Sequence, residues 1–301
     1  LYMSEAFYNA KNLTVSNGFV RNPDRYYLEE YFVQRPASNT VATAPLTNAD
    51  GSHADNTAII LARGLANRNF EVLGTNITTA LCTFNPEGGL IITTAGADQD
   101  QAIIAPHIDP NQSSWTSTKW GSDNQVEWEC AIRLPAIDNQ KVWAGLKLTN
   151  DQLLATDPDQ AFFKFQTDDD ETDNNEAFTD FSKLHFIYSK AGTDYISQLP
   201  ITVAANTNYK LRISIDSSRY VRIFVNGTQY NITTTAGSTG GTAVTAGTTS
   251  SKQLEDIIDF IPYIGIEAGA GAAEALHVFY QKISRALPKN LWKALPKNQL
   301  F

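Results

Sequence analysis

The sequence predicts an all-β protein in which residues 67–287 form one large two-sheet antiparallel β-sandwich. Two observations predict this class: hydrophobic residues alternate with polar ones at a period of two, and long helical periodicity is nearly absent from this range. Strands must therefore cover strands, because no helices are available to cover a sheet, and a βαβ topology is excluded. The composition agrees, since 42% hydrophobic and 18% charged residues provide for a core without a signature of disorder.

The clearest alternation lies in two segments. Residues 125–134 place Val126, Trp128 and Cys130 on one side and acidic or amide residues on the other, and residues 209–216 repeat the pattern. A hairpin follows at once, because Asn226-Gly227 separates two strand-like runs and supplies the positive φ angles of a type I′ turn. This turn is the most specific local prediction.

Shorter segments complete the sandwich and suggest about a dozen strands in all. They are residues 69–74, 80–84, 89–94, 101–105, 142–148, 161–166, 183–189, 263–267 and 275–283. Residues 231–251 are rich in Gly, Thr and Ser, so we expect a mobile surface loop that interrupts one domain. No second domain is predicted.

The N-terminal residues 1–66 differ in composition and are predicted to form an extended docking arm with little core of its own. One short helix is expected, because Asn22 can cap it, Pro23 can occupy its first position and Pro36 can end it. Its apolar face would be formed by Tyr27, Leu28, Tyr31 and Phe32.

The C-terminal residues 288–301 form a basic, apolar tail on an acidic chain, in which ALPKN occurs at 286–290 and again at 294–298. Exposed apolar side chains in such a tail predict packing against the body or a neighbouring subunit, with a functionless tail as the alternative. The predicted docking residues of both ends are Tyr27, Tyr31, Phe32, Trp292, Leu295 and Phe301.

Charge and cysteine content restrict the partners. A net charge of -9 disfavours nucleic acid, and the sequence shows neither a membrane-span run nor a signal-peptide layout, so we expect a soluble protein. The first Met is residue 3, so we expect translation to begin upstream. Cys82 and Cys130 predict two buried free thiols, with one inter-strand disulfide as the alternative.

Four segments together resemble a known family. Residues 93–109, residues 113–134, the Asn226-Gly227 hairpin and residues 277–287 are similar to the concanavalin A-like lectin/glucanase jelly roll, in the form found in tailed-phage virion proteins. The resemblance covers residues 67–287 and rests on the order of the strands and on these short sequence segments.

The resemblance implies a non-enzymatic virion structural protein at the virion surface, a capsid decoration or fibre component. Its arms would dock on the major capsid protein or on neighbouring subunits, as a homo-oligomer. The alternative is a carbohydrate-binding adhesion module for a host-surface glycan, and a glucanase-like glycoside hydrolase is third. Fold alone cannot choose among these roles.

An acidic run after the strand-like residues 161–166 offers two further hypotheses. Glu171 to Glu176 matches the E-x-D-x-x-E string of laminarinase-type glucanases, but the intervening positions are polar, which favours a solvated loop over catalysis. The same run could instead supply oxygen ligands for Ca²⁺. The candidate ligands are Asp168, Asp169, Asp170, Glu171 and Asp173.

Aromatic and imidazole side chains give weaker signals. Trp115 and Trp120 flank a polar stretch and could stack on sugar rings or lie at an interface, whereas Trp128 and Trp143 are predicted to be internal. The four histidines show no metal-ligand spacing and are predicted to be structural or exposed. They are His53, His107, His185 and His277.

Overall fold

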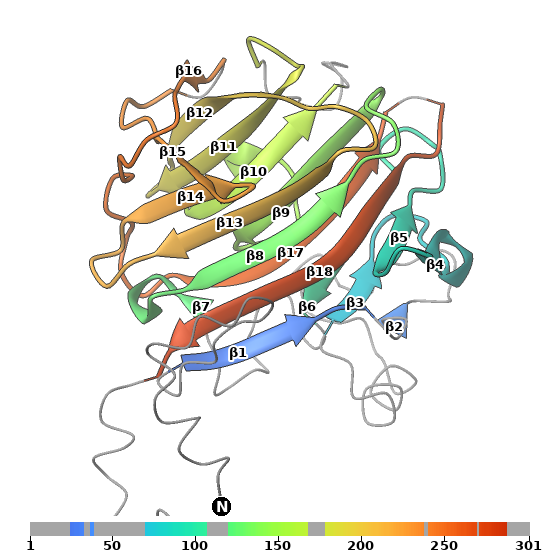
Figure 1. Ribbon diagram of the computed structural model, residues 1–301, viewed down its shortest axis with the longest axis horizontal. Helices are drawn as coiled ribbons and strands as arrows, with labels where there is room; N and C mark the ends of the chain where they lie inside the picture. The colour runs from blue at the N-terminus through green and yellow to red at the C-terminus, as the bar shows by residue number, and fades with distance from the viewer. Residues whose placement is uncertain are drawn as a thin grey trace, which may run out of the picture.

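The protein is a two-sheet β-sandwich in a computed structural model that describes residues 25–32, 37–38, 70–106, 120–167, 178–237, 240–269 and 271–287 (Figure 1). The eight-stranded sheet has the order β15 (Thr228–Tyr230), β14 (Val221–Val225), β13 (Asn208–Ile215), β8 (Glu127–Arg133), β18 (Ala275–Ala286), β5 (Leu90–Thr93) and β4 (Cys82–Phe84), and β1 (Arg25–Glu30) pairs with β18. The predicted fold class is confirmed.

The ten-stranded sheet forms the second layer. Its order is β16 (Thr242–Ala243), β12 (Thr193–Thr202), β11 (Lys183–Lys190), β10 (Gln160–Gln166), β9 (Gln140–Lys147), β17 (Asp259–Ala268), β6 (Gln101–Pro106), β3 (Phe70–Leu73) and β2 (Ala37–Ser38), and β7 (Trp120–Gly121) pairs with β17. The helical elements of the described residues are the short 3-10 turns η2 (Thr79–Leu81), η3 (Ser122–Asn124) and η4 (Leu154–Thr156). In this part of the chain, no helix is long and apolar enough to span a membrane.

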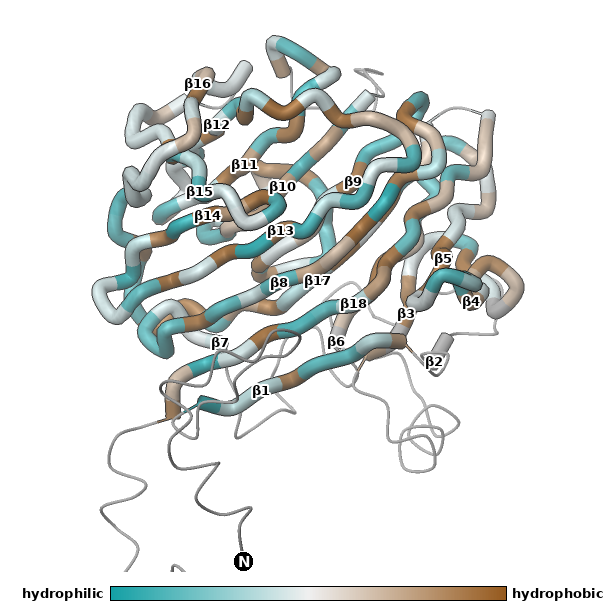
Figure 2. The backbone as a smooth tube through the Cα atoms, viewed as in Figure 1, coloured by the Kyte–Doolittle hydropathy of each residue, from teal (hydrophilic) through white to brown (hydrophobic). Residues whose placement is uncertain are grey.

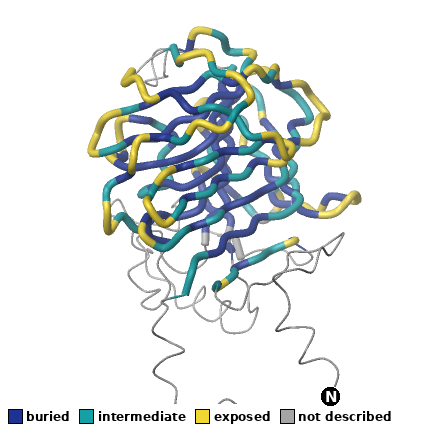
Figure 3. The backbone as a smooth tube through the Cα atoms, turned by 60° about the vertical axis from the view of Figure 1, so that its left-hand side comes forward, coloured by how far each residue is buried: buried dark blue, intermediate teal, exposed yellow. Residues whose placement is uncertain are grey.

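Alternation along the strands builds the core between the sheets. Strand β8 directs Trp128 and Cys130 inward, and β13 directs Leu211 and Ile213 toward the same space. Brown and teal residues alternate along β8, β13 and β14 in Figure 2, and buried strands run through the interior in Figure 3. Cys82 and Cys130 are both buried and free, as predicted.

Every predicted strand segment contains a strand, and the Asn226-Gly227 turn is confirmed. Asn226 has φ 51° and Gly227 has φ 83°, and they join β14 to β15. Strand β12 was not predicted. Pro200 interrupts its pattern, and the β11–β12 register shifts between Lys183 and His185.

The predicted N-terminal helix is wrong, because residues 25–30 form strand β1. Its register with β18 runs from Arg25 opposite Ala286 to Glu30 opposite Gln281, and Leu28 is buried in the core. The ladder of β18 and the burial of Leu28 override the local capping pattern. In Figure 1, β1 lies along the lower edge of β18.

Candidate functional site

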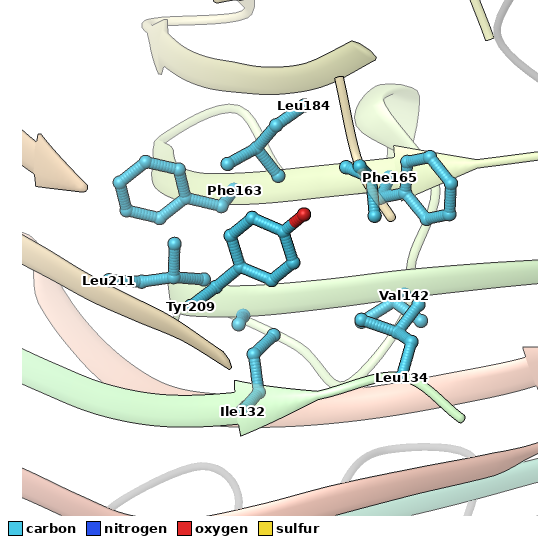
Figure 4. A pocket seen from close by; sticks show the side chains of 10 residues that line it. Ile132, Leu134, Val142, Phe163, Phe165, Leu184, Tyr209 and Leu211 are labelled. Carbon is cyan, nitrogen blue, oxygen red and sulfur yellow. The ribbon is translucent and has the colours of Figure 1, made fainter. Parts of the chain in front are cut away.

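Among the described residues, one void lies in the apolar core between the two sheets. The void there has a volume of about 10 Å³ and is lined by apolar side chains with Tyr209 among them (Figure 4). The Tyr209 hydroxyl accepts a hydrogen bond from the backbone N–H of Ala204 at 2.8 Å. Such a volume holds at most one water molecule, so this void is too small for a ligand.

The outer face of the ten-stranded sheet is filled by the protein's own side chains. Trp143 on β9 and Phe162 on β10 are fully buried here, and Leu154 from η4 packs with them in a second apolar cluster. The Trp143 ring covers Gly265 so closely that a Cβ at that glycine would lie 2.3 Å from the ring. This aromatic layer is closed and offers no stacking surface to a ligand.

A buried ionic network borders that layer. Lys141 Nζ lies 2.8 Å from Glu267 Oε1, and the amides of Gln101 and Gln152 also donate to the Glu267 carboxylate. Lys164 donates to the Gln152 side-chain oxygen at 2.6 Å. The lining of the neighbouring polar cavity, of about 350 Å³, includes Glu267, whose carboxylate is already bound by a lysine and two amides.

A second cavity lies on the other sheet, beside β18, where the pairing of this strand with β5 ends and its pairing with β1 begins. Strand β5 pairs with β18 up to Val278, and β1 pairs with β18 from Gln281 onward. Phe279 and Tyr280 of β18 lie between these two paired stretches and pair with neither β5 nor β1. On the opposite side, the β8–β18 register shifts between Val278 and Tyr280, so Phe279 is the extra residue of a β-bulge. Bulges redirect side chains, and here one opens a groove.

We call this cavity the aromatic groove, and its volume is about 550 Å³. Its lining is mostly aromatic and apolar, with the β4–β5 turn as one wall: Tyr31, Phe32, Phe84, Asn85, Pro86, Glu87, Gly88, Gly89, Phe279 and Tyr280. Tyr31 is 47% exposed and Phe84 is 46% exposed. The groove therefore presents two open rings to solvent.

The turn that forms this wall approaches β18 very closely. A Cβ on Gly89 would lie 2.2 Å from the Val278 carbonyl oxygen, and the residue has φ 82°. Only glycine satisfies both conditions. The Asn85 side chain also accepts the Glu87 N–H at 3.0 Å, so the wall has a defined shape.

Two of the rings are held by a lysine. Lys282 Nζ lies 4.9 Å from the Tyr31 ring centroid and 4.6 Å from that of Tyr280, and the two centroids are 5.9 Å apart. The Tyr280 hydroxyl donates to Glu129 at 2.8 Å, and burial together with this carboxylate raises the pKa of Tyr280. Cation–π contact and a charged hydrogen bond thus fix the ring positions.

A polar cluster forms the rim of the groove. Arg133 donates to Glu87 at 2.6 Å and to His277 Nδ1 at 3.0 Å, and Asn85 is 3.2 Å from the same nitrogen. Because arginine only donates, His277 Nδ1 must accept and the ring is neutral. Burial and the Arg133 charge lower the pKa of His277, and the hydrogen bond with Arg133 lowers that of Glu87.

The groove therefore combines open aromatic faces with paired donors and acceptors. Glu87, whose side chain is 62% exposed, offers a carboxylate to solvent beside the Arg133 guanidinium. Aromatic faces bind the C–H faces of pyranose rings, and a carboxylate beside a guanidinium can bind adjacent hydroxyls. Glu87 is the acidic residue among those that line the groove, so the lining contains no pair of facing carboxylates.

The predicted site residues have different outcomes. Tyr31 and Phe32 line the groove, whereas Tyr27 lies on β1 and is absent from the groove lining. Trp120 is a correction: its side chain is 0% exposed and packs 5.8 Å from Tyr26, so it provides no platform for a sugar. Trp128 and Trp143 are internal, as predicted.

Other predicted residues lie outside the described part of the chain. They are Trp115, the acidic run with its calcium candidates Asp168, Asp169, Asp170, Glu171 and Asp173, its Glu176, and Trp292, Leu295 and Phe301. Among the residues that are described, no group of three or more His, Cys, Asp or Glu side chains could hold a metal ion. Calcium binding by the acidic run stays a prediction.

Sequence reasoning missed Phe84, Phe279 and Tyr280. A signal was available, because Val278-Phe279-Tyr280 is a run of three large residues that breaks the alternation of β18. A break of this kind is typical of a bulge. The contact between Arg133 and Glu87 joins positions 46 residues apart and had no local signal.

Comparison with known proteins gives structural similarity only. No protein-family model and no curated protein matches the chain. Among solved structures, a protein of unknown function from Shewanella oneidensis MR-1 is 10% identical, with a TM-score of 0.47 and 95% of each chain covered. A β-glucanase from Bacillus licheniformis is 11% identical, with a TM-score of 0.46, and 85% of this chain and 97% of that one are covered.

A third structure, a glycosyl hydrolase family 16 protein from Mycobacterium smegmatis, is 10% identical with a TM-score of 0.45, covering 85% of this chain and 98% of that one. These similarities concern the arrangement of the two sheets and carry no information on activity.

Proposed function

We propose that this protein binds carbohydrate without hydrolysing it, and that the aromatic groove is the binding site. The observation that supports this proposal is the pairing of two open rings, Tyr31 and Phe84, with the charged Arg133–Glu87 rim. A pyranose can place its C–H face on a ring and its hydroxyls on the rim. The groove volume of about 550 Å³ accommodates one or two sugar units.

The absence of hydrolysis is part of the proposal. A retaining glycosidase needs two carboxyl groups about 5–5.5 Å apart, one of them protonated near neutral pH. On the outer face of the ten-stranded sheet, Glu267 is instead held by Lys141 and two amides as an ion pair. In the groove, Glu87 is exposed and its pKa is lowered, which suits a hydrogen-bond acceptor and not an acid catalyst.

The test is a glycan array followed by calorimetric titration of the strongest ligand. Phe84→Ala and Tyr31→Ala should each weaken binding by about tenfold, because each removes a stacking face. Phe224→Ala is the matched control, since Phe224 is a partly buried ring on another strand of the same sheet and should bind as the wild type does. Binding that survives both groove substitutions would refute this site.

Hydrolysis is tested separately by a reducing-sugar assay on the same ligands. We expect no product from the wild type. Any product that disappears in Glu171→Gln or Glu176→Gln would overturn the non-enzymatic part of the proposal. No feature among the described residues favours the virion role over sugar binding, so that role stays a prediction from resemblance.

A further inference from the structure

The imidazole of His277 lies where the rim of the aromatic groove meets the β4–β5 wall. Two donors converge on its Nδ1 atom, Arg133 Nη2 at 3.0 Å and Asn85 Nδ2 at 3.2 Å. The Asn85 side-chain oxygen accepts the Glu87 N–H, so the NH₂ group of Asn85 is the part that faces the imidazole. Because both neighbours donate, Nδ1 must be the unprotonated, accepting nitrogen.

Each of these two donors holds part of the groove lining in place. The Arg133 guanidinium also bonds Glu87 Oε2 at 2.6 Å and lies 5.4 Å from the centroid of the Phe279 ring. The Asn85 side chain fixes the wall through the Glu87 N–H at 3.0 Å. Asn85, Glu87 and Phe279 all line the groove. One acceptor atom of His277 therefore positions both the rim and the wall.

Protonation of His277 would remove this acceptor. An imidazolium carries a hydrogen on both ring nitrogens, so Nδ1 would direct its own N–H at the Arg133 and Asn85 donors. The added positive charge would also lie 3.0 Å from a guanidinium nitrogen. Rotation of the ring gives no relief, because it places a C–H where Nδ1 was. Both donors would therefore lose their acceptor in the protonated state.

The charged groups that face His277 come from two neighbouring elements. Strand β8 places Arg133 opposite it, the β4–β5 turn contributes Glu87, and β5 places the uncharged Ile91 opposite it on the other side. Burial and the Arg133 charge lower the pKa of His277, and the Glu87 charge offsets part of this effect. The ring is thus neutral at about pH 7 and becomes protonated in more acidic solution. The pKa of Glu87 is lowered as well, so this carboxylate stays ionised while His277 titrates.

We propose that His277 is a positioning residue of the aromatic groove, and that its protonation in mildly acidic solution disassembles the rim and releases the sugar. The inference rests on the proposed sugar site. Sugar binds the form with neutral His277, so the affinity is full above the pKa of His277 and decreases as the pH falls through it. By linkage, bound sugar lowers the pKa of His277 further.

The first test needs no sugar and follows the full chain by NMR between about pH 7.5 and about pH 5. The Arg133 side-chain resonances and the Glu87 amide resonance should shift with the same midpoint as the His277 ring. In His277→Gln these shifts should disappear, because the Gln oxygen can accept from Arg133 at every pH. A His277 titration that leaves the Arg133 and Glu87 resonances unchanged would overturn the proposal.

The second test repeats the calorimetric titration at the same two pH values, with the oligosaccharide that binds most strongly on the glycan array. The wild type should bind at least about fivefold more weakly at the lower pH. His277→Leu has no acceptor at any pH, so it should bind at both pH values as weakly as the wild type does in acid. His277→Gln should bind more tightly than His277→Leu, with one affinity at both pH values.

Glu274→Gln is the matched control for this titration. Burial raises the pKa of Glu274, so this carboxyl also titrates in mildly acidic solution, but it is absent from the groove lining. The variant should keep the pH dependence of the wild type. Equal wild-type affinity at both pH values would refute the release step and leave the sugar site standing. Absence of glycan binding at either pH would refute the sugar site and the release step with it, whereas the NMR midpoints decide separately whether His277 positions the rim.

Discussion

Substitution of Glu267 by Gln should destabilise the fold strongly, although it changes one atom. The side chains of Lys141 and Glu267 are 0% and 3% exposed, and their charged atoms are 2.8 Å apart. Removal of the carboxylate charge leaves the Lys141 ammonium buried without this counter-charge. Breaking a buried pair in this way costs about 3–5 kcal/mol. We expect about 3 kcal/mol, the lower end, because the Gln oxygen can still accept a hydrogen bond.

Urea denaturation followed by tryptophan fluorescence measures this free energy of unfolding. The double variant Glu267→Gln with Lys141→Met should be destabilised by less than the sum of the two single variants, with a coupling of about 1–3 kcal/mol. Glu127→Gln is the matched control, because its ion pair with Arg212 is 36–39% exposed and should contribute at most about 1 kcal/mol. The reasoning would be refuted if Glu267→Gln lowered the free energy of unfolding by less than about 1 kcal/mol, or if the effects of the two single substitutions simply added up in the double variant.

Two further predictions concern the same sheet and the hairpin. Gly265→Ala should destabilise the protein by about 1–3 kcal/mol, measured by thermal melting, because its Cβ overlaps the Trp143 ring, whereas Gly227→Ala meets no neighbour and should cost only about 1 kcal/mol for its positive φ. The free energy of unfolding should also decrease as the pH is lowered from 6.5 to 4, because burial lowers the pKa of His185 to about 4. In this range the His185 side chain is protonated in the unfolded chain but not in the folded protein. His185→Gln should therefore flatten this part of the plot of unfolding free energy against pH.

Local patterns sufficed for most of the sandwich because its strands face the core on one side. Residues 125–134 and 209–216 alternate so regularly that only one face can be buried, and Asn226-Gly227 supplies a turn conformation that few other pairs adopt. Strand β1 was different. Its Asn-Pro start and its aromatic spacing also suit a helix, and what selects the strand is the ladder with β18, more than 250 residues away.

The candidate site was only partly predictable for the same reason. Tyr31 and Phe32 were identified as docking residues, but on a helix that does not form. Phe279 becomes part of the groove through a bulge whose position depends on pairing with β8. Trp120 was interpreted as an exposed ring because its neighbours in sequence are polar, yet pairing of β7 with β17 and contact with Tyr26 bury it.

The position of β1 also decides whether the groove exists. Arg25 anchors the strand by donating to the Gln125 carbonyl oxygen at 2.7 Å and to the Ser284 hydroxyl at 2.9 Å, and the far end of the same strand delivers Tyr31 to the groove. Without β1, Phe279 and Tyr280 would border open solvent on that side, and the Lys282 ammonium would lose one of its two rings. The N-terminal segment is thus a structural part of the proposed sugar site. If the N-terminal segment served only to dock on a neighbouring protein, residues 25–30 would have no need to pair with β18 of their own chain.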